Sequence, residues 1–340
     1  MSRYQREATV CRKLVLLYVT ISVDTESSDS PLAIKRFDLF APMVYGQIEN
    51  SYWGVPKIME LCDHYACKAT FFVSVFEYKK YGEDGLSQLC ADIKQKGHDV
   101  QLHIHPIWDY GKRYMHEYSL QDQIQIVDAG KKLLKKWVAE APIAHRAGVY
   151  GADEDTLKAL KENGIPIDSS NFYGNRNCHL SITRNKIVEK HGVIEMPVTV
   201  FQRNTCMTFG FTKFTRRRGI VKTDVNWASL DELLEFVKQA KAHNLAIMNF
   251  FLHSYSFLKF DPSLNHFLPD THTAKEFESF LSTVTKDAEI KIITVSEFYD
   301  RYCRAPTSFA NGSDFVPMFQ KNMNLMTAIG GKLKLSARLK

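Results

Sequence analysis

The sequence predicts an α/β fold in one domain, built on a parallel sheet or barrel. Stretches with the pattern of buried strands alternate along the chain with stretches of helical periodicity. The first strand, residues 14–23 (LVLLYVTISV), is apolar and rich in β-branched residues, which is typical of a strand buried on both faces. A chain of 340 residues that is 45% hydrophobic can bury a single large core.

The expected elements follow one another in a regular order. After the first strand they are a loop-rich insertion at 27–51, a helix near 55–64, a strand at 68–75, a helix near 86–96, a strand at 98–106, a helix at 119–139, a strand at 142–144, a helix from about 153 to 163, a strand at 192–201, a helix at 229–243, a strand at 246–253, a helix from 273 and a last strand at 290–294. Ser229-x-x-Glu232 and Thr273-x-x-Glu276 have the pattern of a capping box, which marks the start of a helix.

Two histidines lie at the end of the strand expected at 98–106 (HDVQLHIHP). His103 and His105 are two positions apart, so their side chains fall on the same face of the strand. Both imidazoles can therefore reach one metal ion, and histidine is the commonest metal ligand. The alternative, equally consistent with these residues alone, is a pair of histidines satisfied by local hydrogen bonds.

Two carboxylates, Asp24 and Glu26, directly follow the first strand. Acidic side chains avoid burial unless they are paired or bound to a metal, so their position beside a buried strand indicates chemistry rather than stability. One can ligate a divalent cation while the other acts as a general base. The alternative is a loop or helix-capping cluster, because Ser27, Ser28 and Asp29 come next.

Polar side chains also stand at the ends of two later strands. Arg146 follows the short strand at 142–144, and His253 ends the apolar strand at 246–253. A histidine in a mostly apolar setting can serve as a general acid with a shifted pKa. Taken singly, each residue could equally have a structural role, Arg146 in an ion pair. Four strand ends with polar groups of these types predict a site at one rim of the barrel.

These residues fall in motifs that resemble those of the NodB-homology polysaccharide deacetylases, which are metal-dependent sugar N-deacetylases. The motifs occur in the family's order, over roughly residues 12–300. They are VDTE at 23–26, ATFFV at 69–73, GHDVQLHIHP at 97–106, HRAGVYG at 145–151 and FLHS at 251–254. Each is weak alone, and five in order make a specific signal. The resemblance implies the family's α/β fold, a distorted, seven-stranded (β/α) barrel, over residues 12–305.

The resemblance also implies a role for each motif residue. Asp24 would be the catalytic base and Glu26 a metal ligand, with the reverse assignment also open. His103 matches the first metal histidine. The family's second histidine lies four positions later, where this chain has Ile107, and His105 is the near substitute.

The same resemblance completes the catalytic set and the substrate contacts. Arg146 would orient the base, and His253 would be the general acid. Leu252, Tyr150 and Trp108 would contact the substrate, with Leu252 lining the pocket for the acetyl methyl group.

The implied activity is hydrolysis of a carbon–nitrogen bond. An N-acetyl or other small N-acyl group would be removed from an amino sugar, in a polysaccharide or in its nucleotide- or lipid-linked precursor. The implied cofactor is a divalent metal, zinc or a related ion (Co, Ni, Mn or Fe), which lowers the pKa of a bound water. Two alternatives stay open: a metal-independent amidase of the same fold, and a non-catalytic carbohydrate-binding protein.

The number and spacing of the cysteines indicate the cellular compartment in which the protein works. They number seven, are scattered, and include no CxxC pair, which is typical of reduced thiols and predicts a cytoplasmic protein. The apolar N-terminal run lacks a small-residue cleavage site, and no apolar stretch is long enough to cross a bilayer. A cytoplasmic deacetylase points to a precursor, rather than a finished cell-wall polymer, as the substrate.

The formal net charge of +6 is unevenly spread. Lys213 and the arginines at 216–218 form a cluster that suits a phosphate-bearing substrate or, equally, a solvated loop. Residues 306–340 are expected to form a basic C-terminal tail, either disordered or in peripheral contact with the inner membrane face. Residues 332–340 alternate between apolar and basic side chains, a period of two that suggests an edge strand or a surface-bound segment. Nucleic acid is not expected as a partner, because no aromatic residues are interleaved with the basic ones.

Overall fold

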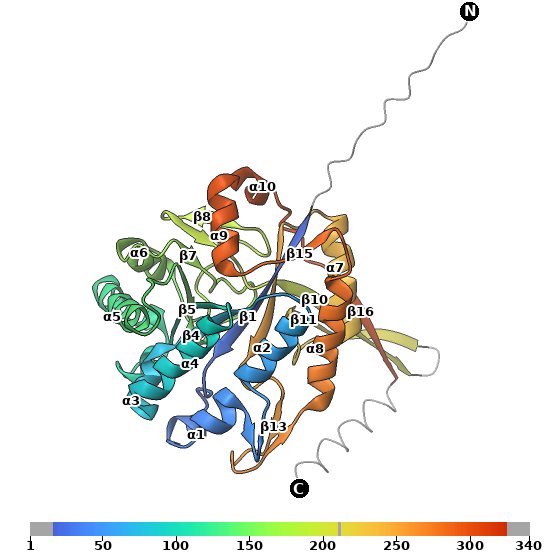
Figure 1. The fold of residues 1–340 in the computed structure, drawn as a ribbon. Helices are drawn as coiled ribbons and strands as arrows, with labels where there is room; N and C mark the ends of the chain where they lie inside the picture. Colours follow the sequence, from blue (N-terminus) through green and yellow to red (C-terminus); the bar gives the residue numbers. More distant parts are fainter. Residues whose placement is uncertain (1–15, 210–211, 325–340) are drawn as a thin grey trace, which may run out of the picture.

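The structure confirms an α/β fold in which a curled, mainly parallel sheet forms a distorted barrel (Figure 1). This computed structural model describes residues 16–209 and 212–324. Within these residues the main sheet has nine strands, two more than expected, in the order β12-β1-β4-β5-β6-β7-β9-β8, with β15 also paired to β1. Its strand pairs are parallel except β8 with β9. The strands are β1 (Leu17–Thr25), β4 (Thr70–Ser74), β5 (Asp99–Ile104), β6 (Ala144–Ala147), β7 (Ile167–Asp168), β8 (Val188–Lys190), β9 (Val193–Glu195), β12 (Ile247–His253) and β15 (Ile290–Ile292).

Helices cover the outside of the barrel, with α5 and α6 on one side and α7 and α8 on the opposite side (Figure 1). They are α1 (Pro31–Ile34), α2 (Val55–His64), α3 (Tyr78–Tyr81), α4 (Glu83–Gln95), α5 (Leu120–Val138), α6 (Glu154–Glu162), α7 (Leu230–Ala242), α8 (Thr271–Val284), α9 (Val295–Arg304) and α10 (Pro306–Ala310). α7 begins with the predicted capping box at Ser229. α8 begins earlier than predicted, because the Asp270 side chain caps it by accepting a hydrogen bond from the Thr273 backbone N–H.

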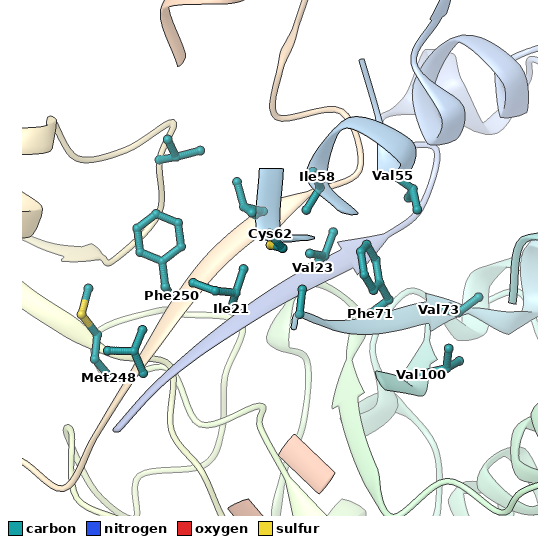
Figure 2. Close-up of a cluster of buried hydrophobic side chains, with 14 of the residues drawn as sticks. Ile21, Val23, Val55, Ile58, Cys62, Phe71, Val73, Val100, Met248 and Phe250 are labelled. Carbon is teal, nitrogen blue, oxygen red and sulfur yellow. The ribbon is translucent and has the colours of Figure 1, made fainter. Parts of the chain in front are cut away.

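One face of the sheet packs against the helices in a hydrophobic core (Figure 2). Ile21 and Val23 of β1 lie in this core with Phe71 of β4, Phe250 of β12 and Ile58 of α2. All five side chains are fully buried. Because side chains alternate along a strand, the residues between them point to the barrel interior.

The inward-facing side chains near the carboxyl end of β1 are polar. Thr20 donates a hydrogen bond to the Asn249 side chain at 3.0 Å, and Ser22 donates to a backbone carbonyl of β12 at 3.2 Å. The first strand is therefore buried on both faces, as predicted, but its inner face carries hydroxyl groups. Asp24 follows Thr20 and Ser22 in the same alternation, so its carboxylate also points into the barrel, at the end of the strand.

A second sheet of three strands projects from the barrel (Figure 1). In the order β11-β10-β16, it contains β10 (Val200–Phe209), β11 (Thr212–Lys222) and β16 (Met318–Asn324). Residues 192–201 were predicted as one strand, but they belong to two, β9 and the start of β10. Pro197 lies between these two strands, and proline has no backbone N–H to donate to a sheet. The basic cluster predicted as a loop or phosphate site lies in β11, and its side chains fall outside the described part of the chain.

The chain beyond residue 305 is not a tail throughout. Phe309 of α10 is buried against the rings of Tyr18 and Phe298, with ring centroids 5.3 Å and 5.1 Å away. β16 then pairs in parallel with β10. The expected boundary therefore falls inside packed structure, while residues 325–340, with the alternating segment, lie outside the described residues. None of the described helices is long and apolar enough to cross a membrane.

The insertion at 27–51 contains more regular structure than expected, and it lies at one side of the barrel rim. It holds α1, a short π-helix (Phe40–Tyr45) and the start of a hairpin of β2 (Gln47–Ile48) and β3 (Ser51–Tyr52), and it packs near the hairpin of β13 (Leu258–Phe260) and β14 (Phe267–Pro269). Leu39 and Met43 share an apolar cluster with Leu264 of the β13–β14 loop. Arg36 ties the two segments by donating to the Asn265 side chain at 2.9 Å.

Replacing Phe309 by alanine tests whether α10 belongs to the core. We expect the free energy of unfolding to fall by about 3–5 kcal/mol, because a fully buried ring is removed. Met318→Ala is the control: this side chain is 56% exposed, and a change within about 0.5 kcal/mol is expected. Urea denaturation measures both. An unchanged unfolding free energy in Phe309→Ala would mean that this segment contributes nothing to the core.

Candidate metal centre and active site

The predicted site residues meet at the carboxyl ends of the parallel strands. Asp24 of β1 is the register neighbour of His253 of β12, and His103 of β5 neighbours Arg146 of β6. Parallel strands end at a common edge, so the sheet itself brings these distant segments together. The cleft at this edge has a volume of about 510 Å³, and its lining includes Asp24, Glu26, His103, His105, Tyr150 and His253.

Glu26, His103 and His105 form a buried cluster of metal-ligating side chains. One candidate ligand atom from each lies within 4.8 Å of the others. Nε2 of His103 is 3.2 Å from Glu26 Oε2 and 3.1 Å from His105 Nε2, which is itself 2.5 Å from the same oxygen. Nδ1 of His103 is 2.8 Å from the Arg146 carbonyl oxygen and donates its proton there, so Nε2 is free to act as a ligand.

This donor set fits a divalent metal ion. Burial raises the pKa of Glu26, but positive charge at His105 and hydrogen bonds from both histidines outweigh burial and hold the pKa well below its ordinary value. A metal ion can supply that positive charge in place of protons. One carboxylate and two imidazoles are ligands that zinc and related ions use, with a position left for water. His105 thus lies within reach of the same point as Glu26 and His103, as a second histidine ligand would have to.

Asp24 and Arg146 form a buried ion pair inside the barrel. Arg146 Nη1 donates to Asp24 Oδ1 at 2.5 Å, and the guanidinium is fully buried. Its other groups donate to Ser22 Oγ at 3.1 Å and to the Oγ and carbonyl of Ser169 at 3.1 and 3.3 Å. Burial raises the pKa of Asp24, but Arg146 and the nearby histidines outweigh burial, so the pKa lies below its ordinary value and the carboxylate stays charged.

Two aromatic rings hold the Arg146 guanidinium between them. Its central carbon lies 4.1 Å from the ring centroid of Phe72 on β4 and 4.3 Å from that of Phe251 on β12. A desolvated cation–π contact of this kind is worth about 2 kcal/mol. The two rings therefore fix the guanidinium from both sides, with its Nη1 directed at Asp24.

Sequence reasoning missed two charged residues beside His253. Asp224 Oδ2 lies 4.0 Å from His253 Nδ1 and 2.8 Å from Lys222 Nζ. Burial and the Lys222 charge lower the pKa of His253, while the charges of Asp24 and Asp224 oppose that shift. Asp224 comes just after the apolar residues 220–221 of β11, so it carried the signal that identified Asp24: an acid directly after a strand.

The turn after Arg146 holds two residues in the left-handed backbone region. Val149 and Tyr150 have φ angles of 50° and 60°, and such a conformation costs about 1–3 kcal/mol at a residue like valine. Both residues line the cleft. Tyr150, predicted to contact the substrate, therefore lies in the cleft wall, where its hydroxyl accepts a hydrogen bond from Lys222 at 3.0 Å.

Two other predicted substrate contacts do not line the cleft. Leu252 precedes His253 on β12 and so points to the opposite face, where it is fully buried in the helix-covered core. Trp108 packs against the same core and beside Lys80, whose ammonium lies 4.7 Å from the ring centroid. The aromatic residues that line the cleft, besides Tyr150, are Phe172, Trp227, Tyr255 and Phe260.

Replacing His103 or His105 by alanine tests the metal cluster. Each variant loses one of three ligands, so we expect bound divalent metal to fall from near one ion per chain to background. Elemental mass spectrometry of the purified, metal-reconstituted proteins measures this. His64→Ala, an exposed position, is the control and should keep its metal. Unchanged metal content in both cluster variants would exclude this site.

Replacing Arg146 by methionine tests the ion pair. A buried carboxylate is left without a partner, so we expect the free energy of unfolding near neutral pH to fall by about 3–5 kcal/mol. Without Arg146, burial raises the pKa of Asp24 above its ordinary value of 3.8, so the folded state binds a proton more readily than the unfolded state. The deficit should therefore shrink as the pH falls toward that value. Urea denaturation at neutral and mildly acidic pH measures it.

The double variant Asp24→Asn, Arg146→Met distinguishes the cost of an unpaired buried carboxylate from the loss of the packing contacts of Arg146. It should be more stable than Arg146→Met alone, because no uncompensated charge stays buried. A loss that is independent of pH and equal in the single and double variants would contradict the ion-pair account.

Neither a protein-family model nor a curated protein sequence matches this chain. Solved structures match it in fold. A Mycobacterium smegmatis protein described as a candidate polysaccharide deacetylase has 16% sequence identity and a TM-score of 0.59, with 87% of this chain and 93% of that chain covered. The PuuE allantoinase has 10% identity and a TM-score of 0.55, with 86% and 92% covered.

The 4-alpha-glucanotransferase of Thermococcus litoralis also matches, at 10% identity and a TM-score of 0.51, with 84% of this chain but only 40% of that chain covered. Proteins with three different names thus share this fold, so the activity has to be argued from the site. The chain has the distorted barrel fold that its resemblance to the NodB-homology polysaccharide deacetylases implies.

Proposed function

We propose that the protein is a metal-dependent hydrolase that removes an N-acetyl or other small N-acyl group from an amino sugar. The observation that carries the proposal is the convergence of three chemical groups in one cleft: the Glu26–His103–His105 cluster, the Asp24–Arg146 ion pair and His253. A metal-ligating set, an oriented carboxylate and a histidine can together catalyse the hydrolysis of an amide.

Glu26, His103 and His105 would hold the metal, which when bound makes a water more acidic and polarises the acyl carbonyl. Asp24 is the base. Its lowered pKa keeps it ionised at neutral pH, and the single hydrogen bond from Arg146 Nη1 fixes one oxygen, so the other can accept the proton of the attacking water. Arg146 is the positioning residue, because its guanidinium donates to Asp24 and to serines and lies between ring faces, and it does not line the cleft.

His253 lies across the cleft edge from Asp24 and is the general acid. As the water oxygen bonds to the acyl carbon, the carbon–nitrogen bond breaks and the amine nitrogen takes a proton from the His253 imidazolium. Burial and Lys222 lower the pKa of His253, and Asp224, 4.0 Å from Nδ1, opposes that shift and so favours the protonated form. The products are a carboxylate and a free amino sugar.

The cleft wall suits a sugar. Trp227 and Phe260 line it and are 51% and 40% exposed, so they offer flat apolar surfaces on which a sugar ring can stack. Asn175 and Asn226 add amide groups for hydroxyls. Five described cysteines are free thiols, which supports a cytoplasmic location and a nucleotide- or lipid-linked precursor as the substrate, although a polysaccharide offers the same bond.

Release of acetate from N-acetylglucosamine oligomers and from UDP-N-acetylglucosamine tests the proposal. Zinc-loaded protein should release acetate, and Asp24→Asn and His253→Ala should each lower kcat by about 10²-fold or more, because each removes a proton-transfer group. Asp84→Asn, an exposed position, is the matched control for Asp24→Asn.

Removal of the metal is the second arm of this test. Activity should disappear on chelation and return with added zinc or a related ion. Activity that survives full removal of the metal would replace the proposal with a metal-independent amidase. Binding of these sugars without any turnover would replace it with a carbohydrate-binding protein.

A further inference from the structure

Lys222 is a buried lysine in the wall of the cleft. Its side chain is 2% exposed, although lysine is among the residues least often buried. Nζ lies 2.8 Å from Asp224 Oδ2 and donates to the Tyr150 hydroxyl at 3.0 Å. Burial lowers the pKa of Lys222, but Asp224 and Tyr150 outweigh burial and hold the pKa above its ordinary value. The ammonium is therefore charged at neutral pH.

Lys222 and Tyr150 each have one hydrogen-bond donor that can bind a ligand. An ammonium has three N–H donors, and a phenol that accepts a hydrogen bond still has its own proton to donate. Within the described part of the chain, the oxygen partners of the Lys222 ammonium are Asp224 and Tyr150, which leaves one N–H. Burial raises the pKa of Tyr150 to about 12, so the phenol keeps its proton. The cleft wall thus offers one N–H and one O–H from groups 3.0 Å apart.

The position of Lys222 also distinguishes it from the other basic residues near the site. It is the only lysine or arginine among the described residues that line the cleft. The two neighbouring arginines are engaged: Arg146 with Asp24, and Arg113 with Asp29 at 2.6 Å. Lys222 is itself paired with Asp224, but it lines the cleft and keeps one N–H, so a negative group that enters the cleft meets it rather than either arginine.

Aromatic rings direct a ligand toward this cation. The Lys222 ammonium lies 5.1 Å from the ring centroid of Trp227 and 5.2 Å from that of Phe251. Trp227 is half exposed, so a sugar ring stacked on it has Lys222 within reach of its substituents. Asp224 connects this point to His253, so the bound substituent lies close to the reacting amide.

We infer that Lys222 and Tyr150 bind a carboxylate of the substrate, so that the site acts on N-acylated amino sugars that carry an acidic group. The inference rests on the proposed function. A carboxylate presents two acceptor oxygens in one plane, which matches an N–H and an O–H on adjacent groups. A small planar group also suits an almost fully buried cation better than a tetrahedral phosphate within a nucleotide.

Two matched substrates test this inference. They are N-acetylglucosamine oligomers and the same oligomers with carbon 6 of the sugar oxidised to a carboxylate. The metal-loaded full chain should favour the acidic form by about 10- to 100-fold in kcat/KM, the range for a hydrogen bond to a charged group. Lys222→Met should remove the preference by raising KM for the acidic form. Tyr150→Phe should remove part of it.

A control variant and a binding measurement make the test independent of folding and catalysis. Lys238→Met removes a lysine that is 79% exposed and outside the cleft lining, and it should keep the preference. In NMR titrations, D-glucuronate should bind the wild-type protein more tightly than D-glucose does, and Lys222→Met should abolish that difference. Near-native spectra of the variants establish that they are folded.

The outcomes distinguish the inference from the proposed function. Equal turnover of both substrates, or a preference that survives in Lys222→Met, overturns the inference and leaves the deacetylase proposal standing. A preference for UDP-N-acetylglucosamine over the acidic oligomers also overturns it, in favour of phosphate recognition. No turnover of any substrate, with glucuronate binding that depends on Lys222, overturns the proposed function and supports carboxylate recognition.

Discussion

The buried Arg146–Asp24 ion pair is the interaction on which the rest of the site depends. An isolated charge inside the barrel would be very costly, so each member requires the other. The pair is also built into the sheet, because Phe72 of β4 and Phe251 of β12, the strands that flank β1, hold the guanidinium between their rings. The carbonyl of Arg146 accepts a hydrogen bond from His103, so one residue orients both Asp24, the proposed base, and one of the candidate metal ligands.

The sequence was sufficient to predict the parallel α/β architecture and the meeting of the candidate site residues at one edge of the sheet. Such features can be read from short stretches of sequence. The alternation of side chains along a strand determines which face each residue occupies, and residues at the end of a strand lie at the rim of the barrel. Asp24, His103 and His253 are each identified by position in this way. Parallel pairing then brings such strand ends to one edge, as the register of β1 with β12 illustrates.

What the sequence could not give depends on contacts between distant segments. Leu252 was placed in the cleft on family resemblance, although its neighbour His253 already takes the inward face. Lys222 and Asp224 were missed because β11 belongs to a second sheet, and only the folded chain shows that this sheet ends at the barrel rim. The start of α8 was misplaced because Asp270 competes with Thr273 as the cap, a choice that packing decides.

The placement of β1 between β4 and β12 has a consequence for biosynthesis. Thr20 of β1 meets Asn249 of β12, which is 229 residues later in the chain. At about 5–20 residues per second, an apolar first strand waits about 10–50 s on the ribosome before that partner emerges. The residues of the metal cluster are all translated by residue 105, well before His253. The candidate metal ligands can therefore come together before the barrel closes, and a nascent chain that is stalled in between exposes an apolar strand edge that its last partner has not yet covered.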